Sequence, residues 1–578
     1  MTPEPIRYTV SFPAPHTHYA VVEADFPTEG RAAIDLFMPV WTPGSYLVRE
    51  FARHVEDIAG PAPVTRTSKN RWRAETGGAD RIRVTYRVYC REMSVRNNWV
   101  EADFALLNGA PTFLTLANDP APRPHEITVI LPEAWKTTMS GMEEIPGGAA
   151  HCYIATDYDT LVDSPLLCGN PSIRSFEVDG IPHFLVTEGG DDIWDNTKAA
   201  ADVEKIVRRY RDMWGGLPYQ NKFVFLNLLT ETGGGLEHKN SFTIMASRWA
   251  TRTRGAYLKW LDLFSHEFFH AWNVKRLRPV ELGPFNYEAE NPTRSLWVAE
   301  GFTEYYGGLT VHRAGLTTQA EYLGTGADTE GSLSALIQKL QSTPGRLALS
   351  VAQSSFDAWI RLYRPDENSN NVTISYYVKG AVIAWLLDAK IRRATNDAKS
   401  LDDVMRLAFG RFSGERGFTP EEIKSTTEEV AGITLAEFFH NAVETPGELD
   451  YAEALDWFGL AFRAGTASGK AYLGCETKVD SGRLLVSRVP RGTPAVDAGL
   501  NVDDEILAID DYRVRADQLA TKLENYKPGD RISLLIARRD KLMTLTATLA
   551  EEPGKWQLEY MPGATSDQKA HLQAWLRN

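Results

Sequence analysis

Several features are scarce or absent in this chain of 578 residues, and each absence excludes a class of protein. Only four cysteines occur, Cys90, Cys152, Cys168 and Cys475, and none belongs to a Cys-x-x-Cys pair. These thiols suit a reducing compartment, and they predict neither a disulfide framework nor a cysteine zinc site. No run of eighteen apolar residues occurs, so we expect no membrane span.

The chain also lacks an excess of basic residues and a recognisable export signal. Its 62 basic and 76 acidic residues give a net charge of -14, which argues against nucleic acid as a partner. The opening residues, Met1 to Pro5, show neither the basic nor the apolar region of a signal peptide. We expect a cytoplasmic protein, or a periplasmic one if a processed signal is missing from this sequence.

Length and hydrophobic pattern predict a multidomain α+β protein. At about 150 residues per domain, the chain should hold three or four domains. Residues 1–175 show short alternating runs between turn residues, which predicts an N-terminal β-sandwich. Residues 176–456 mix strands with helices and become mostly helical from about residue 330. Residues 457–553 form a compact β-rich unit, and the tail 554–578 is too short to be a domain.

The stretch His266-Glu267-Phe268-Phe269-His270 points most directly to chemistry. Its apolar spacing predicts a helix that starts near Ala256 and stops before Pro279. On that helix His266 and His270 project from one face and suit a single zinc ion, while Glu267 can reach a metal-bound water. Two histidines on a half-buried helix, matching by chance, remain the alternative for this pattern alone.

A zinc ion held by two histidines needs one more protein ligand and an open position for water. The segment from Trp297 to Tyr306 predicts a second helix that places Glu300 and Glu304 on a common face. Glu300 is the predicted third ligand, and Glu304 is its rival.

A glycine-rich segment precedes the zinc helix and ends in Glu237-His238. It lies between two predicted strands, Phe223–Leu229 and Ser241–Ser247, and suggests an antiparallel edge strand beside a peptidase cleft. Gly234 and Gly235 would let a substrate backbone approach, and Glu237 would project into the groove. A hairpin with a surface glutamate is the alternative.

For two aromatic segments, the sequence is compatible with either a packing role or a functional role. Tyr377, at the entrance of a predicted helix, could donate a hydrogen bond to a developing oxyanion, although a packed tyrosine is the commoner explanation. The turn from Trp41 to Tyr46 is either a buried aromatic corner or a functional loop.

Four motifs in this order resemble those of the glycyl aminopeptidase family of gluzincin zinc metallopeptidases. They are Gly-Gly-Leu-Glu-His, His-Glu-Phe-Phe-His-Ala-Trp-Asn, Trp-Val-Ala-Glu-Gly-Phe-Thr and Tyr-Val-Lys-Gly. The Trp-Thr-Pro-Gly-Ser-Tyr turn and a C-terminal unit similar to a PDZ domain extend the resemblance over nearly the whole chain. It implies a thermolysin-like zinc peptidase domain between an N-terminal β domain and a PDZ-like domain.

The resemblance also implies roles for individual residues. It implies one Zn²⁺ per chain on His266, His270 and Glu300, with Glu267 as general base and Tyr377 as oxyanion donor. Glu237 would bind the substrate's α-amine, beside Gly234 and Gly235. Two departures from the broader aminopeptidase pattern stand out: twenty-nine residues separate His270 from Glu300, and His238 replaces the usual Asn.

The expected function is therefore a zinc aminopeptidase that hydrolyses the first peptide bond of peptides with a free N-terminus. From the resemblance, N-terminal Gly or Ala should be preferred, and the PDZ-like unit could bind a peptide C-terminus. A thermolysin-like endopeptidase is the enzymatic alternative, and it would not need Glu237. A PDZ peptide-binding scaffold with a vestigial zinc site is the alternative from another class.

Overall fold

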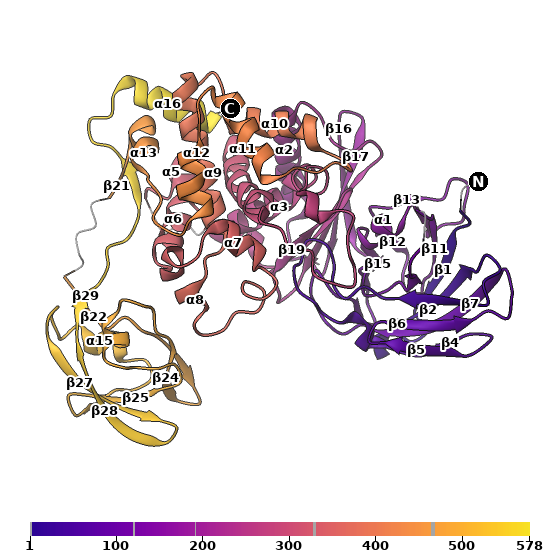
Figure 1. The fold of residues 1–578 in the computed structure, drawn as a ribbon, viewed down its shortest axis with the longest axis horizontal. Helices are drawn as coiled ribbons and strands as arrows, with labels where there is room; N and C mark the ends of the chain where they lie inside the picture. The colour runs from indigo at the N-terminus through magenta and orange to yellow at the C-terminus, as the bar shows by residue number, and fades with distance from the viewer. Residues whose placement is uncertain (1–2, 120–121, 191, 327–330, 464–468, 578) are drawn as a thin grey trace. The chain divides into compact units, whose positions relative to one another are not determined.

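The computed structural model describes residues 3–119, 122–190, 192–326, 331–463 and 469–577 (Figure 1). The chain divides into two compact units. The first comprises Met1–Thr293, Tyr306–Thr317 and Met405–Ile423, and the second comprises Arg294–Tyr305, Thr318–Val404 and Lys424–Asn578.

The first unit opens with a β-rich domain, as the alternating runs predicted. Residues of two of its sheets, such as Tyr8 and Val22 in one and Leu36 and Trp72 in the other, share one hydrophobic core. The seven-stranded sheet runs β13 (Glu143–Glu144), β14 (Cys152–Ala155), β11 (His125–Ile130), β1 (Ile6–Ser11), β2 (Tyr19–Pro27), β7 (Arg81–Tyr89) and β4 (Val55–Ala59). The second sheet runs β10 (Thr115–Leu116), β3 (Ala33–Phe37), β6 (Arg71–Glu75) and β5 (Val64–Ser68). A third runs β12 (Thr137–Ser140), β15 (Leu166–Gly169), β9 (Ala105–Leu107) and β8 (Trp99–Val100), and α1 spans Tyr158–Val162.

A five-stranded sheet follows and carries the glycine-rich segment at its edge. Its order is β16 (Ser172–Val178), β17 (Ile181–Glu188), β18 (Phe223–Leu229), β20 (Ser241–Ala246) and β19 (Gly234–Glu237). Strands β18 and β20 are parallel neighbours, whereas β19 and β20 are joined by three residues as a hairpin. Glu237 is buried in that hairpin, so the surface glutamate of the alternative is wrong. Strand β19 pairs antiparallel with β20, which confirms the predicted antiparallel edge strand.

Two long helices belong to this part of the chain. Helix α2 (Asn196–Trp214) lies between β17 and β18 in the sequence, and α3 (Arg254–Phe269) follows β20. The side chain of Thr253 caps α3 by accepting a hydrogen bond from the backbone N–H of Ala256. Phe264 of α3 packs against both Phe225 and Phe242, with its ring centroid 4.7 and 4.9 Å from theirs. The helix ends at Phe269, nine residues before the predicted end at Arg278, so the sequence overestimated its length.

Helices dominate residues 297–458, a longer range than the mostly helical part that the sequence predicted from about residue 330. They begin with a π-helical turn, η5 (Trp297–Phe302), which continues into α4 (Thr303–Arg313). The others are α5 (Gln319–Leu323), α6 (Leu333–Gln341), α7 (Val351–Phe356), α8 (Ser369–Val372), α9 (Tyr376–Thr395), α10 (Leu401–Phe412), α11 (Pro420–Ala431), α12 (Ala436–Phe439) and α13 (Ala452–Phe458). The segment Ser369–Thr395 is long and apolar enough to cross a membrane, but 83% of its most apolar window is buried, as in a core helix.

A compact β-rich unit with its own core is inserted near the end of the chain. Its core includes Leu473, Val486, Ile506 and Leu534. The main sheet runs β23 (Glu476–Asp480), β24 (Arg483–Arg488), β25 (Glu505–Ile509), β27 (Arg531–Arg538) and β28 (Lys541–Thr548), with β26 (Tyr512–Arg513) on β25. β22 (Ala471–Tyr472) pairs with β29 (Ala550–Glu551), and two short helices are α14 (Pro494–Asp497) and α15 (Leu519–Leu523).

The chain then returns to the helical part of the second unit. Strand β30 (Leu558–Tyr560) pairs antiparallel with β21 (Leu460–Phe462), and α16 spans Ser566–Arg577. Trp575 of α16 is fully buried, its ring lies 4.5 Å from that of Phe458, and its Nε1 donates to the Tyr305 hydroxyl at 2.8 Å. The C-terminal tail, residues 554–578, which the sequence analysis assigned to no domain, therefore packs into this helical core.

Candidate metal centre and active site

The end of α3 presents two histidines. His270 is the C-cap residue and keeps helical angles (φ -61°, ψ -19°), so the four-residue spacing from His266 still places both rings together, 4.9 Å apart. The backbone oxygen of Asn273 lies 2.8 Å from His270 Nδ1, which suits donation by Nδ1–H and leaves Nε2 for a metal. Just beyond, Val274 has φ +100°, a strained conformation for a β-branched residue, and the chain turns away from the helix there.

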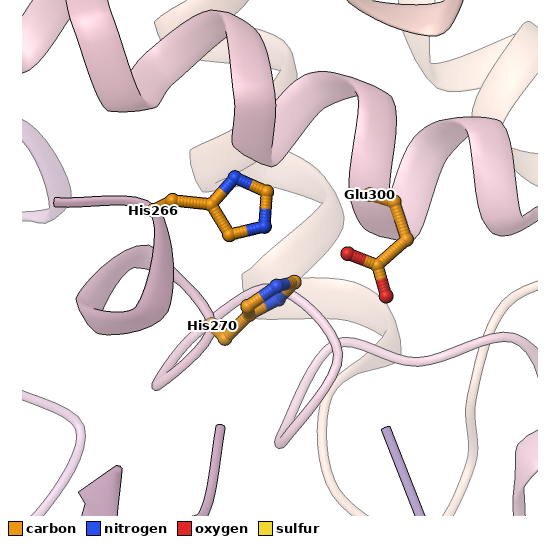
Figure 2. A group of neighbouring side chains, drawn as sticks. All are labelled: His266, His270 and Glu300. Atoms are coloured by element: carbon orange, nitrogen blue, oxygen red, sulfur yellow. The ribbon is translucent and has the colours of Figure 1, made fainter. Parts of the chain in front are cut away.

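Glu300 completes a set of three potential ligands. One ligand atom from each of His266, His270 and Glu300 lies within 4.8 Å of the others, and Figure 2 shows the three side chains converging. Glu304, the rival ligand, belongs to neither of the two metal-capable groups found among the described residues. Glu300 occupies the π-helical turn η5, a local feature frequent at functional sites.

A pair of glycines brings the Glu300 segment against the helix that carries Tyr377. A Cβ on Gly301 would stand 2.5 Å from the Cα of Gly380, so only glycine allows this backbone-to-backbone crossing of η5 and α9. Tyr377 is the second residue of α9. Burial, with the nearby charge of Glu300, raises the pKa of Tyr377 well above its ordinary value, so its phenol remains a hydrogen-bond donor at neutral pH.

Strand β19 passes directly over the predicted general base. A Cβ on Gly235 would lie 1.9 Å from Glu267 Oε1, so a side chain at this position would displace the Glu267 carboxylate. Gly234 has φ +129°, which also favours glycine. Glu237, Glu267 and His270 form the second metal-capable group, again with ligand atoms within 4.8 Å of one another.

The Glu237 carboxylate is buried, being 4% exposed, and its Oε1 has no hydrogen-bond partner among the described residues. It borders a cavity of about 20 Å³, which is room for about one water-sized group. The rest of the lining comes from the turn after Trp41 and from residues after the zinc helix, namely Trp41, Pro43, Gly44, Tyr46, Val274, Lys275, Leu282 and Phe285.

The turn from Trp41 to Tyr46 is thus both a buried aromatic corner and a wall of this cavity. Trp41 and Tyr46 are fully buried, and Trp41 Nε1 donates to the backbone oxygen of Asn286 at 2.8 Å. Gly44 has φ +85°, and a Cβ there would lie 2.6 Å from Glu237 Oε2. The buried aromatic corner is therefore confirmed, and a functional role for this turn stays a prediction.

Two charged residues near Glu237 escaped the sequence analysis, Asp163 and Lys275. Lys275 Nζ lies 2.5 Å from Asp163 Oδ1, and the same oxygen is 3.1 Å from His238 Nδ1. Asp163 Oδ2 accepts from the backbone N–H of Lys239 at 2.8 Å. Lys275 follows the zinc motif directly and could have been noticed there, but no sequence signal links Asp163 to a glycine-rich segment about 75 residues away.

Family models match three parts of the chain. The Peptidase M61 N-terminal domain matches residues 7–170, the M61 glycyl aminopeptidase model matches residues 259–383, and a PDZ domain matches residues 471–549. The two M61 models together cover half of the sequence. The PDZ match coincides with the inserted β-rich unit. No curated protein matches this sequence.

Among solved structures, an aminopeptidase N family protein from Idiomarina loihiensis is similar over the whole chain. It has a TM-score of 0.90 and 29% identity, covering 99% of this chain and 100% of that one. An M1 zinc metallopeptidase from Deinococcus radiodurans is more distant, with a TM-score of 0.48, 14% identity, and coverage of 78% and 95%. The chain belongs to the M61 glycyl aminopeptidase family, and it is a zinc aminopeptidase with a PDZ domain.

Proposed function

We propose that this enzyme removes one residue at a time, Gly or Ala foremost, from peptides with a free α-amine. The observation that carries the proposal is the buried carboxylate of Glu237 beside Glu267 and His270. A buried carboxylate oxygen without a partner is costly, and a substrate ammonium would supply the missing hydrogen bond and charge. Binding the amine there fixes the register, so that only the first peptide bond reaches the catalytic residues.

The size of the cavity at Glu237 supports a small first residue. At about 20 Å³ it accommodates an ammonium-sized group and little more. Its walls are aromatic and aliphatic, and Gly44 could not carry a side chain without striking Glu237. We therefore expect glycine and alanine to be accepted beside Glu237, and the branched chain of leucine to need more room than this cavity offers.

One zinc ion would be held by His266, His270 and Glu300. Two imidazoles and a carboxylate are the donor set of many catalytic zinc sites, and their ligand atoms lie close enough to share one ion. The hydrogen bond at His270 Nδ1 leaves the ring nitrogen that such a site needs. When bound, zinc supplies a Lewis acid that polarises the scissile carbonyl and lowers the pKa of a water molecule.

The protein's own groups would then move and hold protons. Glu267, beneath β19, takes a proton from the attacking water and delivers it to the leaving amine. Tyr377, kept protonated, donates to the oxyanion that develops on the carbonyl. The backbone of β19, free of side chains at Gly234 and Gly235, lets an extended substrate approach as an additional strand.

A panel of aminoacyl chromogenic substrates tests this proposal, each used with a free and with an acetylated amine. We expect cleavage led by Gly and Ala, lost with a chelator and restored by zinc, and little turnover of acetylated substrates. Glu237→Gln, which keeps the shape and removes the charge, should raise KM for free amines strongly. Equal cleavage of free and acetylated substrates by the unmodified enzyme would favour an endopeptidase, and a panel led by Leu or Arg would refute the size argument.

The PDZ domain supports a second, binding function. Strand β23 forms an edge of its sheet, directly after the Tyr472-Leu473-Gly474 loop that could face a carboxylate. We propose that this edge binds an extended peptide through its free C-terminus. Titration with peptides that end in a carboxylate or an amide tests this, since only the carboxylate should bind.

A further inference from the structure

The cavity at Glu237 contains a potential internal competitor for the substrate. Among the nine residues that line it, Glu237 carries the only negative charge and Lys275 the only positive charge. The Lys275 ammonium is chemically the same kind of group as the α-ammonium of a peptide. A flexible lysine side chain beside a buried carboxylate would ordinarily pair with it.

The Lys275 ammonium is instead bound to another carboxylate. Its Nζ lies 2.5 Å from Asp163 Oδ1, and both side chains are buried, with exposures of 7% and 10%. Asp163 comes from the N-terminal β domain, where it is the C-cap residue of α1. Three groups hold this carboxylate in place: Lys275, the backbone N–H of Lys239 and the ring of His238.

The state of Glu237 agrees with this arrangement. One of its carboxylate oxygens has no hydrogen-bond partner in the described part of the chain, although Lys275 borders the same small cavity. Burial raises the pKa of the Asp163 carboxyl, but Lys275 and His238 lower it more, to well below its ordinary value. Asp163 therefore stays charged, and stays paired with Lys275, throughout the neutral range.

We propose that Asp163 is a positioning residue that holds the Lys275 ammonium away from Glu237 and so keeps this carboxylate open to the substrate's free amine. The inference rests on the proposed role of Glu237 as the amine-binding group. Asp163 touches no reacting atom, and it acts through the lysine. Its removal should therefore affect substrate binding, and the chemical step should be nearly unchanged.

The test compares Asp163→Asn with the double variant Asp163→Asn/Lys275→Met. In the single variant the ammonium is released beside Glu237, so KM for a glycyl substrate should rise at least tenfold while kcat stays within about threefold. In the double variant no competing ammonium remains, and KM should return to within about threefold of the unmodified enzyme. Zinc content and circular dichroism establish that each variant is folded and loaded.

Asp159→Asn is the matched control. Asp159 belongs to the same helix α1, but its carboxylate accepts from the Tyr287 hydroxyl at 2.6 Å, so KM should not change. Rescue by Lys275→Met separates the proposal from an effect through His238, which both Asp163 variants disturb equally.

Two results would overturn the inference alone: an unchanged KM in Asp163→Asn, or a double variant as impaired as the single one. If Asp163→Asn fails to fold, the double variant still decides, because a tenfold rise in its KM would contradict the proposal. An unmodified enzyme that cleaves acetylated and free substrates equally would remove the amine-binding role of Glu237, and with it both proposals.

Discussion

Gly235 lies on the edge strand at the point where that strand covers Glu267. The atom nearest to an added Cβ would be Glu267 Oε1, the end of a flexible side chain, which can swing aside at little cost in stability. Gly235→Ala should therefore retain fold and zinc while kcat falls by roughly 10²–10⁴, the contribution typical of a general base. Steady-state kinetics with a zinc assay measure both quantities.

Gly233→Ala provides the control for this substitution. A Cβ at Gly233 would meet only the backbone oxygen of Met245, at an ordinary 3.8 Å, so its kcat should stay near that of the unmodified enzyme. Equal losses in the two variants would mean that the strand, and not the displacement of Glu267, causes the effect.

Tyr377 and its neighbour Tyr376 allow a second comparison of single residues. Tyr377→Phe removes the phenol expected to donate to the oxyanion, and kcat should fall by roughly 10²–10³. Tyr376 stacks on Tyr377 with ring centroids 4.8 Å apart, and Tyr376→Phe keeps that contact, so its kcat should change little. An undiminished kcat in Tyr377→Phe would mean that Tyr377 only packs and does not donate to the oxyanion.

At the scale of elements, the spacing of apolar residues predicted those strands and helices whose buried side chains recur at regular intervals. Strand β18 has the predicted bounds Phe223–Leu229, because all seven of its residues are buried and turn residues follow. The end of α3 does not follow from apolar spacing. The apolar spacing continues past Phe269, but the Asn273 oxygen engages the His270 ring and Val274 turns the chain with φ +100°. Both features are local, but apolar spacing alone does not encode them, so the pattern runs past the true end of the helix.

The segment around Glu300 was likewise predicted as an ordinary helix, whereas it contains the π-helical turn η5. A wider turn rotates the residues after it, so the four-residue spacing does not place Glu304 on the same line as Glu300. Glu300→Ala should therefore lose zinc, and Glu304→Ala should retain most of it, as measured by metal content after dialysis. The reverse result would assign the third ligand to Glu304.

The crossing of η5 and α9 makes a prediction about backbone contact. A Cβ at Gly380 would lie 2.6 Å from the backbone oxygen of Trp297, which cannot move without shifting the Glu300 segment. Gly380→Ala should lower both zinc affinity and stability, the latter by about 1–3 kcal/mol, as overpacking does. Gly410, inside α10 with nothing near an added Cβ, provides the opposite case. Gly410→Ala should stabilise the fold by about 0.5–1 kcal/mol, and thermal unfolding of both variants measures these effects.

At the scale of the whole molecule, sequence patterns separated the parts but missed one connection between them. The C-terminal unit was recognisable from its own turns and strands, and its core is indeed separate. The packing of the C-terminal tail against the helical part was not recognisable from the sequence. The partners of Trp575 are Phe458 and Tyr305, which lie more than a hundred residues earlier in the chain. Long-range pairing of this kind leaves no trace in composition or periodicity. Asp163 and Lys275 were missed for the same reason.

Two truncations should therefore behave differently. Phe462 and Leu558 are paired residues of β21 and β30, so a short glycine-rich linker can replace residues 464–554. That variant should keep small-substrate kcat within about tenfold, a barrier change of at most about 1.4 kcal/mol. Deleting residues 457–578 also removes Phe458 and Trp575, and truncation of one large buried aromatic alone costs about 3–5 kcal/mol.

Thermal unfolding and kinetics on a glycyl substrate distinguish the two truncations, with Trp575→Ala as a point-mutant equivalent of the longer deletion. A linker variant that folds but is inactive on small substrates would mean that the PDZ domain helps to build the active site.

The pairing of β21 with β30 has a consequence for proteolysis. The PDZ domain is attached at both of its ends, and the segment after it includes a helix with a buried tryptophan. A single cleavage on either side of the domain would therefore release nothing: the two fragments would stay together through α16 and migrate as one species on a native gel. Only a second cleavage would free the domain, so a peptide caught by it would remain with the enzyme even after the chain had been cut once.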